Sequence, residues 1–185
     1  MRLASSDLGT PHRKDGSVHM RIRHISVRNF RGIKELDWAL GTNDIFCLIG
    51  AGDSTKSTIL EAIQRVFHPQ WNLEFDDADF YKCLEGNSIS IIVTLGDLPD
   101  EFRDLRKYGY WLSGWDALNQ RASIDPVDGL EDALRVRLTV GEDLRPHWSV
   151  VKKNKDKAVE FRPNDRSKVA VSLIGTFSDR HLSWA

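Results

Sequence analysis

A short apolar run, a polar loop with two glycines and an amphipathic segment follow one another between Ile45 and Phe67. The apolar run, Ile45–Ile49, has the composition of a strand that is buried on both faces. The loop reverses the chain, and the apolar residues after it recur at helical spacing. A buried strand, a tight loop and a helix in this order predict an α/β fold, with the loop at the end of a central strand.

The loop has the spacing of a phosphate-binding loop. Its sequence over residues 50–58, GAGDSTKST, matches the pattern G-x-x-x-x-G-K-[ST], except that Thr55 replaces the second glycine. Backbone N–H groups of such a loop, together with the positive end of the helix dipole, bind an anion. Lys56 then reaches the terminal phosphates and Ser57 ligates Mg²⁺. The pattern indicates a nucleotide site, and an ordinary loop before a capped helix is the alternative.

The threonine in this pattern leaves two geometries open. A β-branched residue at positive φ is unfavourable by about 1–3 kcal/mol. Thr55 therefore either keeps a negative φ or belongs to a loop that is shaped differently from the glycine-rich form. The hydroxyl of Ser54 or Thr55 could also cap the following helix.

The rest of the chain predicts a mixed sheet with an antiparallel N-terminal edge. Residues 1–19 lack apolar periodicity and are expected to form a disordered arm, before a folded part over 20–185. Pro99 is expected to open a second helix that runs to Tyr108, and residues 109–128 are predicted to be a loop. Alternating or β-branched segments predict strands over 20–30, 35–40, 88–95, 134–140, 147–152 and 169–174.

Composition excludes several classes of protein. No apolar run approaches the roughly 18 residues of a membrane span, and the N-terminus lacks the apolar core of a signal peptide. The two cysteines, Cys47 and Cys83, are too few for a secreted disulfide scaffold. These features predict a cytoplasmic protein without a membrane partner.

Charge is balanced over the whole chain, at −1, but it is unevenly distributed. Residues 1–34 hold eight basic and two acidic side chains, whereas residues 70–105 hold nine acidic and two basic ones. Residues 152–168 are basic again. Solvated faces explain such segments most simply, and a basic strip that meets a phosphate backbone is the alternative.

The sequence Asn29-Phe30-Arg31-Gly32 after the first predicted strand, and GDSTK in the loop, point to a known group. Together they resemble the N-terminal part of the ABC-type ATPases that include SMC proteins, RecF and the overcoming-lysogenization-defect (OLD) nucleases. The loop is most similar to that of OLD-like ATP-dependent endonucleases. The likeness covers residues 20–105 well and the remainder loosely. It implies a P-loop NTPase of the AAA/ABC type, ATP and Mg²⁺ as cofactors, and DNA and a second ATPase head as partners.

The resemblance also implies a role for individual residues. Lys56 would neutralise the β- and γ-phosphates as the catalytic residue, and Ser57 would hold Mg²⁺. Arg31, with Asn29 beside it, would lie next to the nucleotide, and a surface residue in a turn is the alternative. The phosphate-wrapping residues of this Walker A loop would be Gly50, Ala51, Gly52, Asp53, Ser54 and Thr55, with Thr58 on the α-phosphate side.

Several motifs that complete catalysis in this group are not recognisable in the sequence. They are a Walker B strand that ends in Asp-Glu, a signature motif, a switch histidine and the carboxylates of a Toprim nuclease domain. The expectation is therefore the N-terminal lobe of a longer ATPase or ATP-dependent endonuclease, in DNA repair or phage defence. The alternative is a truncated, non-hydrolysing nucleotide-binding or interaction fragment.

Three further groups of residues are candidate sites. The carboxylates Asp76, Asp77 and Asp79 could hold a cation, although a solvated acidic loop is the simpler interpretation. Asp179-Arg180-His181 could sense Mg²⁺ and the γ-phosphate or form a local salt bridge. Trp111 and Trp115 could stack on nucleic-acid bases or pack against the protein.

Overall fold

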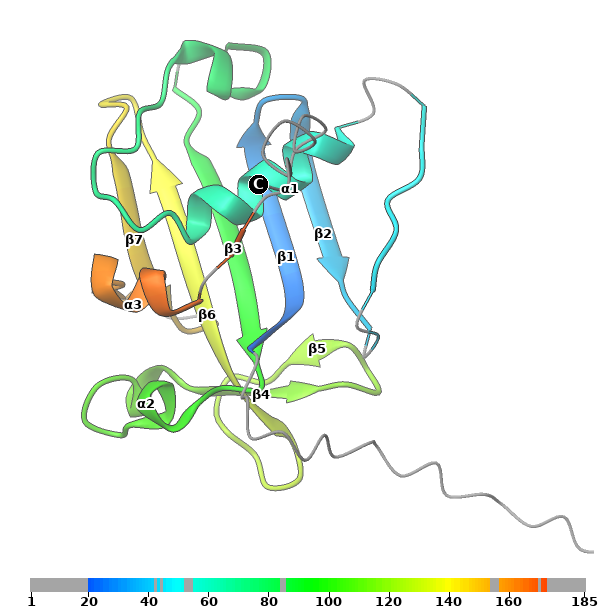
Figure 1. The fold of residues 1–185 in the computed structure, drawn as a ribbon, viewed down its shortest axis with the longest axis vertical. Helices are drawn as coiled ribbons and strands as arrows, with labels where there is room; N and C mark the ends of the chain where they lie inside the picture. The colour runs from blue at the N-terminus through cyan, green and yellow to red at the C-terminus, as the bar shows by residue number, and fades with distance from the viewer. Residues whose placement is uncertain are drawn as a thin grey trace, which may run out of the picture.

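The computed structural model describes residues 20–41, 43, 45–51, 55–83, 86–153, 157–169 and 171–172. Its centre is an eight-stranded sheet in the order β2-β1-β3-β6-β4-β5, with β7 paired to β6 and β8 to β7 (Figure 1). The strands are β1 (Arg21–Phe30), β2 (Ile33–Ala39), β3 (Ile89–Gly96), β4 (Ser113–Asp116), β5 (Arg121–Ala122), β6 (Glu131–Val140), β7 (Pro146–Val151) and β8 (Ala158–Glu160).

All strand pairings in the described part of the chain are antiparallel. The predicted antiparallel edge is confirmed in β1 and β2, which are joined by the turn at Arg31 and Gly32. The predicted mixed sheet is wrong for these residues. A parallel pairing required Ile45–Ile49 as a central strand, and that run lies outside the sheet.

Helix α1 (Lys56–Val66) packs across one face of the sheet, as Figure 1 shows. Ile59, Ala62 and Val66 are buried at helical spacing, so the predicted amphipathic helix is confirmed. Opposite them lie buried side chains of the central strands. These are Ile25, Val27, Ile91, Val93, Val136 and Leu138.

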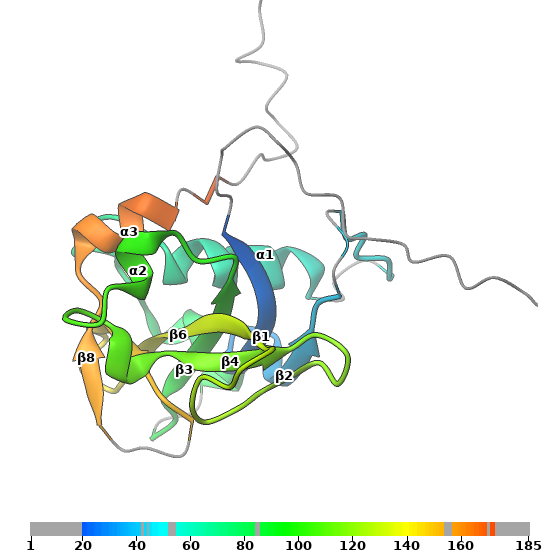
Figure 2. The same cartoon turned by 90° about the horizontal axis from the view of Figure 1, so that it is seen from below.

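Two shorter helices complete the helical part, α2 (Asp100–Arg103) and α3 (Pro163–Val169). Figure 2 shows α1 and α3 on the same side of the sheet. Short 3₁₀ turns, η1 (Asp77–Asp79), η2 (Tyr81–Cys83) and η3 (Gly109–Trp111), connect the larger elements.

Besides the strand expected at Ile45–Ile49, the structure corrects three expectations about secondary structure. The helix after Pro99 ends at Arg103, because Asp104 is extended and its carboxylate accepts the backbone N–H of Arg106 at 2.8 Å. The expected loop over 109–128 contains β4 and β5, which continue the sheet beyond β6.

The expected strand over 169–174 is the third error. Val169 is the last residue of α3, and 171–172 form no strand. The missed signal is Pro163, because proline suits the first position of a helix. Residues 173–174, like residues 1–19, lie outside the described part of the chain.

Candidate functional site at the N-terminus of α1

The N-terminus of α1 brings the predicted lysine and hydroxyl together. Lys56 and Ser57 are the first two residues of the helix, and Thr58 is the third. The first N–H groups of an α-helix have no partner within the helix, and the dipole makes this end positive. The local structure therefore has the polarity that an anion requires.

Lys56 reaches back over the loop that precedes the helix. Its Nζ donates to the carbonyl oxygen of Gly50 at 2.9 Å and to that of Ala51 at 2.5 Å. Gly50 and Ala51 are exposed. Gly52, Asp53 and Ser54, predicted to wrap the phosphates, lie outside the described residues.

Thr55 does not keep the negative φ that was one of its two expected geometries. As the N-cap of α1 it has φ 63° and ψ 8°, which is the left-handed region. Its side chain forms no capping hydrogen bond, so the predicted capping role of Thr55 is wrong. Its carbonyl oxygen accepts the N–H of Ile59 at 3.0 Å and thereby starts the helix.

A cavity of about 470 Å³ adjoins these residues. One part of its wall is polar, and another part is apolar. The lining residues are Phe46, Cys47, Leu48, Thr55, Lys56, Ser57 and Leu60. Volume of this order is typical of small-molecule sites.

The segment before the loop differs from the prediction. Ile45–Ile49 forms no strand, and the side chains of Ile45 and Ile49 are 86% and 90% exposed. A strand that is apolar on both faces is stable only when other elements cover both faces. No described strand pairs with this run, so Ile45 and Ile49 are left on the surface. Leu48, in contrast, packs against the core, and the Phe46 ring meets that of Trp38 edge-on.

Arg31 lies in a cluster of charged side chains beside α1. Its Nε donates to Asp79 Oδ1 at 2.8 Å, and its second guanidinium contact is with the Glu61 carboxylate. Arg65 NH2 lies 3.2 Å from Glu61 Oε1 and 3.5 Å from Asp79 Oδ1. Two guanidinium groups thus share two carboxylates. The predicted nucleotide contact of Arg31 stays a prediction.

Asn29, the companion of Arg31 in that prediction, also has a contact within the protein. Its Nδ2 donates to the carbonyl oxygen of Ser88 at 3.2 Å. Like Arg31 it has a positive φ, at 54°. The contact ties the end of β1 to the segment before β3.

The acidic segment around Asp79 is a structural turn. Asp76 and Asp79 form a capping box on η1, in which Asp76 Oδ1 accepts the N–H of Ala78 at 2.9 Å. The side chain of Asp79 is 6% exposed, because it faces Arg31 and Arg65. The role of Asp79 was missed, although Asp-x-x-Asp is a capping pattern that the sequence contains. Among the described residues, no group of three His, Cys, Asp or Glu is placed to hold a metal ion.

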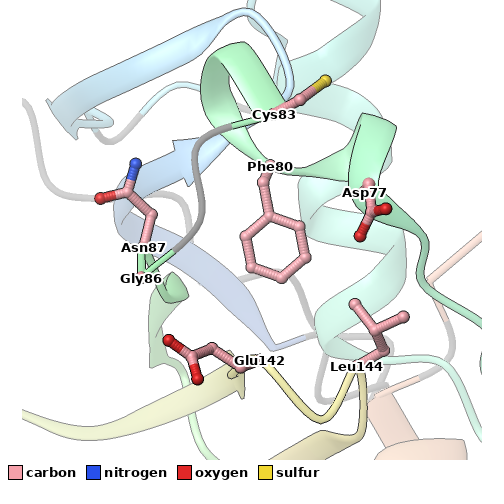
Figure 3. A pocket seen from close by; sticks show the side chains of 7 residues that line it. All are labelled: Asp77, Phe80, Cys83, Gly86, Asn87, Glu142 and Leu144. Carbon is pink, nitrogen blue, oxygen red and sulfur yellow. The ribbon is translucent and has the colours of Figure 1, made fainter.

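A second cavity, of about 390 Å³, lies beyond this turn (Figure 3). It is formed where η1 and η2 approach the turn between β6 and β7. The lining residues are Asp77, Phe80, Cys83, Gly86, Asn87, Glu142 and Leu144. Of these, the sequence analysis pointed only to Asp77, as part of a cation site.

The four described arginines of the basic N-terminal segment are paired with carboxylates. Arg21 pairs with Asp97 at 3.2 Å, and Arg28 pairs with Glu35 at 2.8 Å. Arg23, which is almost buried, binds Glu131 through two nitrogens at 2.9 Å each. These pairs favour a structural role for this segment over a basic strip that meets phosphates.

The two tryptophans pack against the protein. Trp115 is 3% exposed, and its ring centroid lies 6.3 Å from that of His24. Trp111 is partly buried against the core and meets the Tyr110 ring edge-on at 5.2 Å. Base stacking by Trp115 is therefore contradicted by its burial. Asp179-Arg180-His181 lies outside the described residues.

Comparison with known proteins identifies the family. A family described as "AAA ATPase domain" matches residues 20–172. No curated protein matches the chain. A solved structure from work on ATP-driven dimerization and DNA-stimulated activation of SMC ATPases has a TM-score of 0.47 and 16% identity, and it covers 80% of this chain and 74% of that chain.

None of the helices in the described ranges is long and apolar enough to cross a membrane. The match over residues 20–172 includes the loop, α1 and all eight strands of the sheet. The chain therefore belongs to the AAA ATPase domain family of P-loop NTPases.

Proposed function

We propose that this chain is the ATP-binding lobe of an OLD-like or RecF-like DNA-processing ATPase. The observation that carries the proposal is the joint position of Lys56 and Ser57 in the first turn of α1, beside a cavity of about 470 Å³. The membership of the AAA ATPase domain family supports the nucleotide as ligand. The OLD-like assignment rests on the GDSTK loop.

The residues present fit a magnesium nucleotide. Lys56 Nζ binds two backbone carbonyl oxygens, and phosphate oxygens are stronger acceptors for an ammonium group because they are charged. Ser57 is an exposed residue in the wall of the cavity, so its hydroxyl oxygen can ligate a cation that prefers oxygen ligands, such as Mg²⁺. Bound Mg²⁺ would supply charge neutralisation for the phosphates.

We further propose that this lobe is completed by strands from another segment or another chain. The apolar run Ile45–Ile49 supports this, because it is exposed in a conformation that leaves Ile45 and Ile49 in solvent. The sequence contains no apolar run followed by Asp-Glu, so the Walker B carboxylates would come with those strands. A nuclease domain and a DNA partner would belong to that complete protein.

The same run favours one alternative function. In this chain the run before the loop forms no strand, and the sequence has no recognisable Walker B motif. Such a chain would bind a nucleotide without hydrolysing it. In that case the chain is a nucleotide-binding or interaction module. Both functions require Lys56, and only the first requires turnover when the completing segment is present.

Equilibrium binding of a fluorescent ATP analogue with Mg²⁺ tests the proposal. Lys56→Ala should weaken binding by at least about 100-fold, because the principal cation at the phosphates is lost. Lys153→Ala is the matched control, since Lys153 is exposed and the change of net charge is the same. Equal binding by the Lys56 and Lys153 variants would contradict the proposal.

A further inference from the structure

We propose that the turn formed by Arg31 and Gly32 is a positioning element for the nucleotide loop: it holds Thr55 in a left-handed conformation that glycine would adopt without strain. The inference rests on the proposed function, because it concerns the same loop. It explains how a β-branched residue at the position of the second glycine can hold a conformation that is typical of glycine.

The first observation is the strain at Thr55. A φ of 63° is rarely adopted by β-branched residues, because the branched Cβ crowds the backbone. Such a conformation persists where the surrounding structure holds it. Thr55 is also the N-cap of α1, so its backbone conformation sets the positions of Lys56 and Ser57, the next two residues.

The second observation is a close approach. A Cβ atom built on Gly32 would lie 2.9 Å from Thr55 Cγ2, which is closer than carbon atoms approach one another. The backbone of Gly32 therefore packs directly against the methyl group of Thr55. Any larger residue at Gly32 must move either the turn or Thr55.

The third observation is that the turn is fixed from two sides. The backbone N–H of Arg31 donates to the carbonyl oxygen of Asp79 at 2.7 Å, and its Nε donates to Asp79 Oδ1 at 2.8 Å. The guanidinium also binds Glu61, which is one and a half turns along α1 from Lys56. The turn is thus tied to η1 and to the helix whose N-terminus it contacts. It acts as a rigid support.

These contacts predict a coupling between positions 32 and 55 in nucleotide binding. Gly32→Ala should displace Thr55 and redirect Lys56 and Ser57. Thr55→Ser removes only the Cγ2 atom that meets the turn, and it keeps the hydroxyl. The substitution at Gly32 should therefore be tolerated in the Thr55→Ser background.

A double-mutant cycle on the affinity for a fluorescent ATP analogue with Mg²⁺ tests this coupling. Gly32→Ala alone should weaken binding roughly tenfold, whereas in the Thr55→Ser background it should change binding by less than about twofold. Thermal unfolding of all four proteins shows whether each remains folded. An equal loss in both backgrounds would overturn the proposal.

A second variant covers the case in which Gly32→Ala does not fold. Glu61→Gln keeps the size of the side chain but loses the ion pair that ties Arg31 to α1. It should weaken nucleotide binding at least threefold with Thr55 present and leave binding unchanged with Thr55→Gly, since glycine needs no support. Equal losses there would likewise overturn the proposal.

Lys56→Ala, measured in the same series, distinguishes a failure of the proposed function from a failure of the positioning role. If the wild type binds the analogue but Lys56→Ala binds it equally well, the proposed function fails, and this inference fails with it. If binding depends on Lys56 but shows no coupling between positions 32 and 55, only the positioning role is overturned.

Discussion

The two ends of α1 are held in different ways. At the C-terminal end, Trp148 Nε1 donates to the carbonyl oxygen of Arg65 at 3.2 Å. Arg166, 2% exposed, donates to the carbonyl oxygens of His68 at 2.7 Å and of Gln70 at 3.3 Å. At the N-terminal end, Lys56 bonds to exposed loop carbonyls beside a cavity.

The difference separates stability from ligand binding along a single helix. Carbonyl groups at a helix C-terminus attract hydrogen-bond donors, and Trp148 binds that of Arg65. Arg166 binds carbonyl groups of the segment that follows α1, and its guanidinium lies 3.9 Å from the centre of the Trp148 ring. The N–H groups at a helix N-terminus favour an anion instead. We infer that substitutions at the C-terminal end act on folding, and that those at the N-terminal end act on nucleotide affinity.

The largest effect on stability is expected from Trp148→Ala. It removes an 8%-exposed ring from the core, the donor to Arg65 and the platform under Arg166, so the free energy of unfolding should fall by about 3–5 kcal/mol. Chemical denaturation measures the change. Trp148→Phe keeps a ring and should lose about 1–2 kcal/mol. If both variants lose the same amount, the indole is not the anchor.

A smaller effect is expected at Asp165, which precedes Arg166 in α3. Burial alone would raise the pKa of this carboxyl, but hydrogen bonds from Lys107 and Tyr108 and the charge of Lys107 outweigh burial and lower it. A lowered folded-state pKa stabilises the protein above the unfolded carboxyl value of about 3.9. That contribution is lost as the pH falls through the folded-state pKa.

Asp165→Asn should therefore cost about 1.5–3 kcal/mol of unfolding free energy at pH 7. The difference from the wild type should shrink below pH ~4 as the native carboxyl is protonated. Urea unfolding of both proteins over this pH range provides the measurement. A difference that stays constant down to acid pH would exclude the charge of Asp165 as its cause.

Tyr108→Phe should have a smaller effect, of about 1 kcal/mol. The hydroxyl of Tyr108 donates to Asp165 Oδ2 at 2.8 Å, and burial, followed by that hydrogen bond, raises the pKa of the tyrosine. A raised pKa gives stability that is present below the unfolded value of about 10 and is lost at higher pH. The wild type and Tyr108→Phe should therefore converge in unfolding free energy above pH ~10, and parallel curves would contradict the assignment.

The smallest effect on stability is expected from a substitution in the segment before the loop. Ile49→Ser should change the unfolding free energy of this chain by less than about 0.5 kcal/mol, because the side chain is 90% exposed. Ile91→Ser, in the buried centre of β3, is the matched control and should be strongly destabilising. A large loss at Ile49 would show that this run is already packed in solution.

The sequence was sufficient where a local pattern decides the structure. Alternation and β-branching predicted β1, β2, β3, β6 and β7, and the helical spacing after Lys56 predicted α1. The position of Lys56 and Ser57 at the start of the helix was predicted from the same helical spacing. Where apolar residues recur with a regular period along the chain, the helix or strand can be predicted without knowledge of its tertiary contacts.

The sequence was insufficient where a partner is remote. The burial of Asp79 depends on Arg31 and Arg65, which precede it by 48 and 14 positions. The predicted strand Ile45–Ile49 failed because strands exist only with neighbours, and no described strand supplies one. The contact between Gly32 and Thr55 likewise requires the folded turn.

The exposed run Ile45–Ile49 has a consequence for handling the protein. It is uncharged and rich in β-forming residues, and Ile45 and Ile49 are exposed, which is typical of segments that self-associate in solution. Cys47 lies at its centre and is exposed, so oxidation can lock such contacts as disulfides between molecules. Purification of this chain therefore calls for low concentration and a reducing buffer, and a charged substitution at Ile45 should improve its solubility.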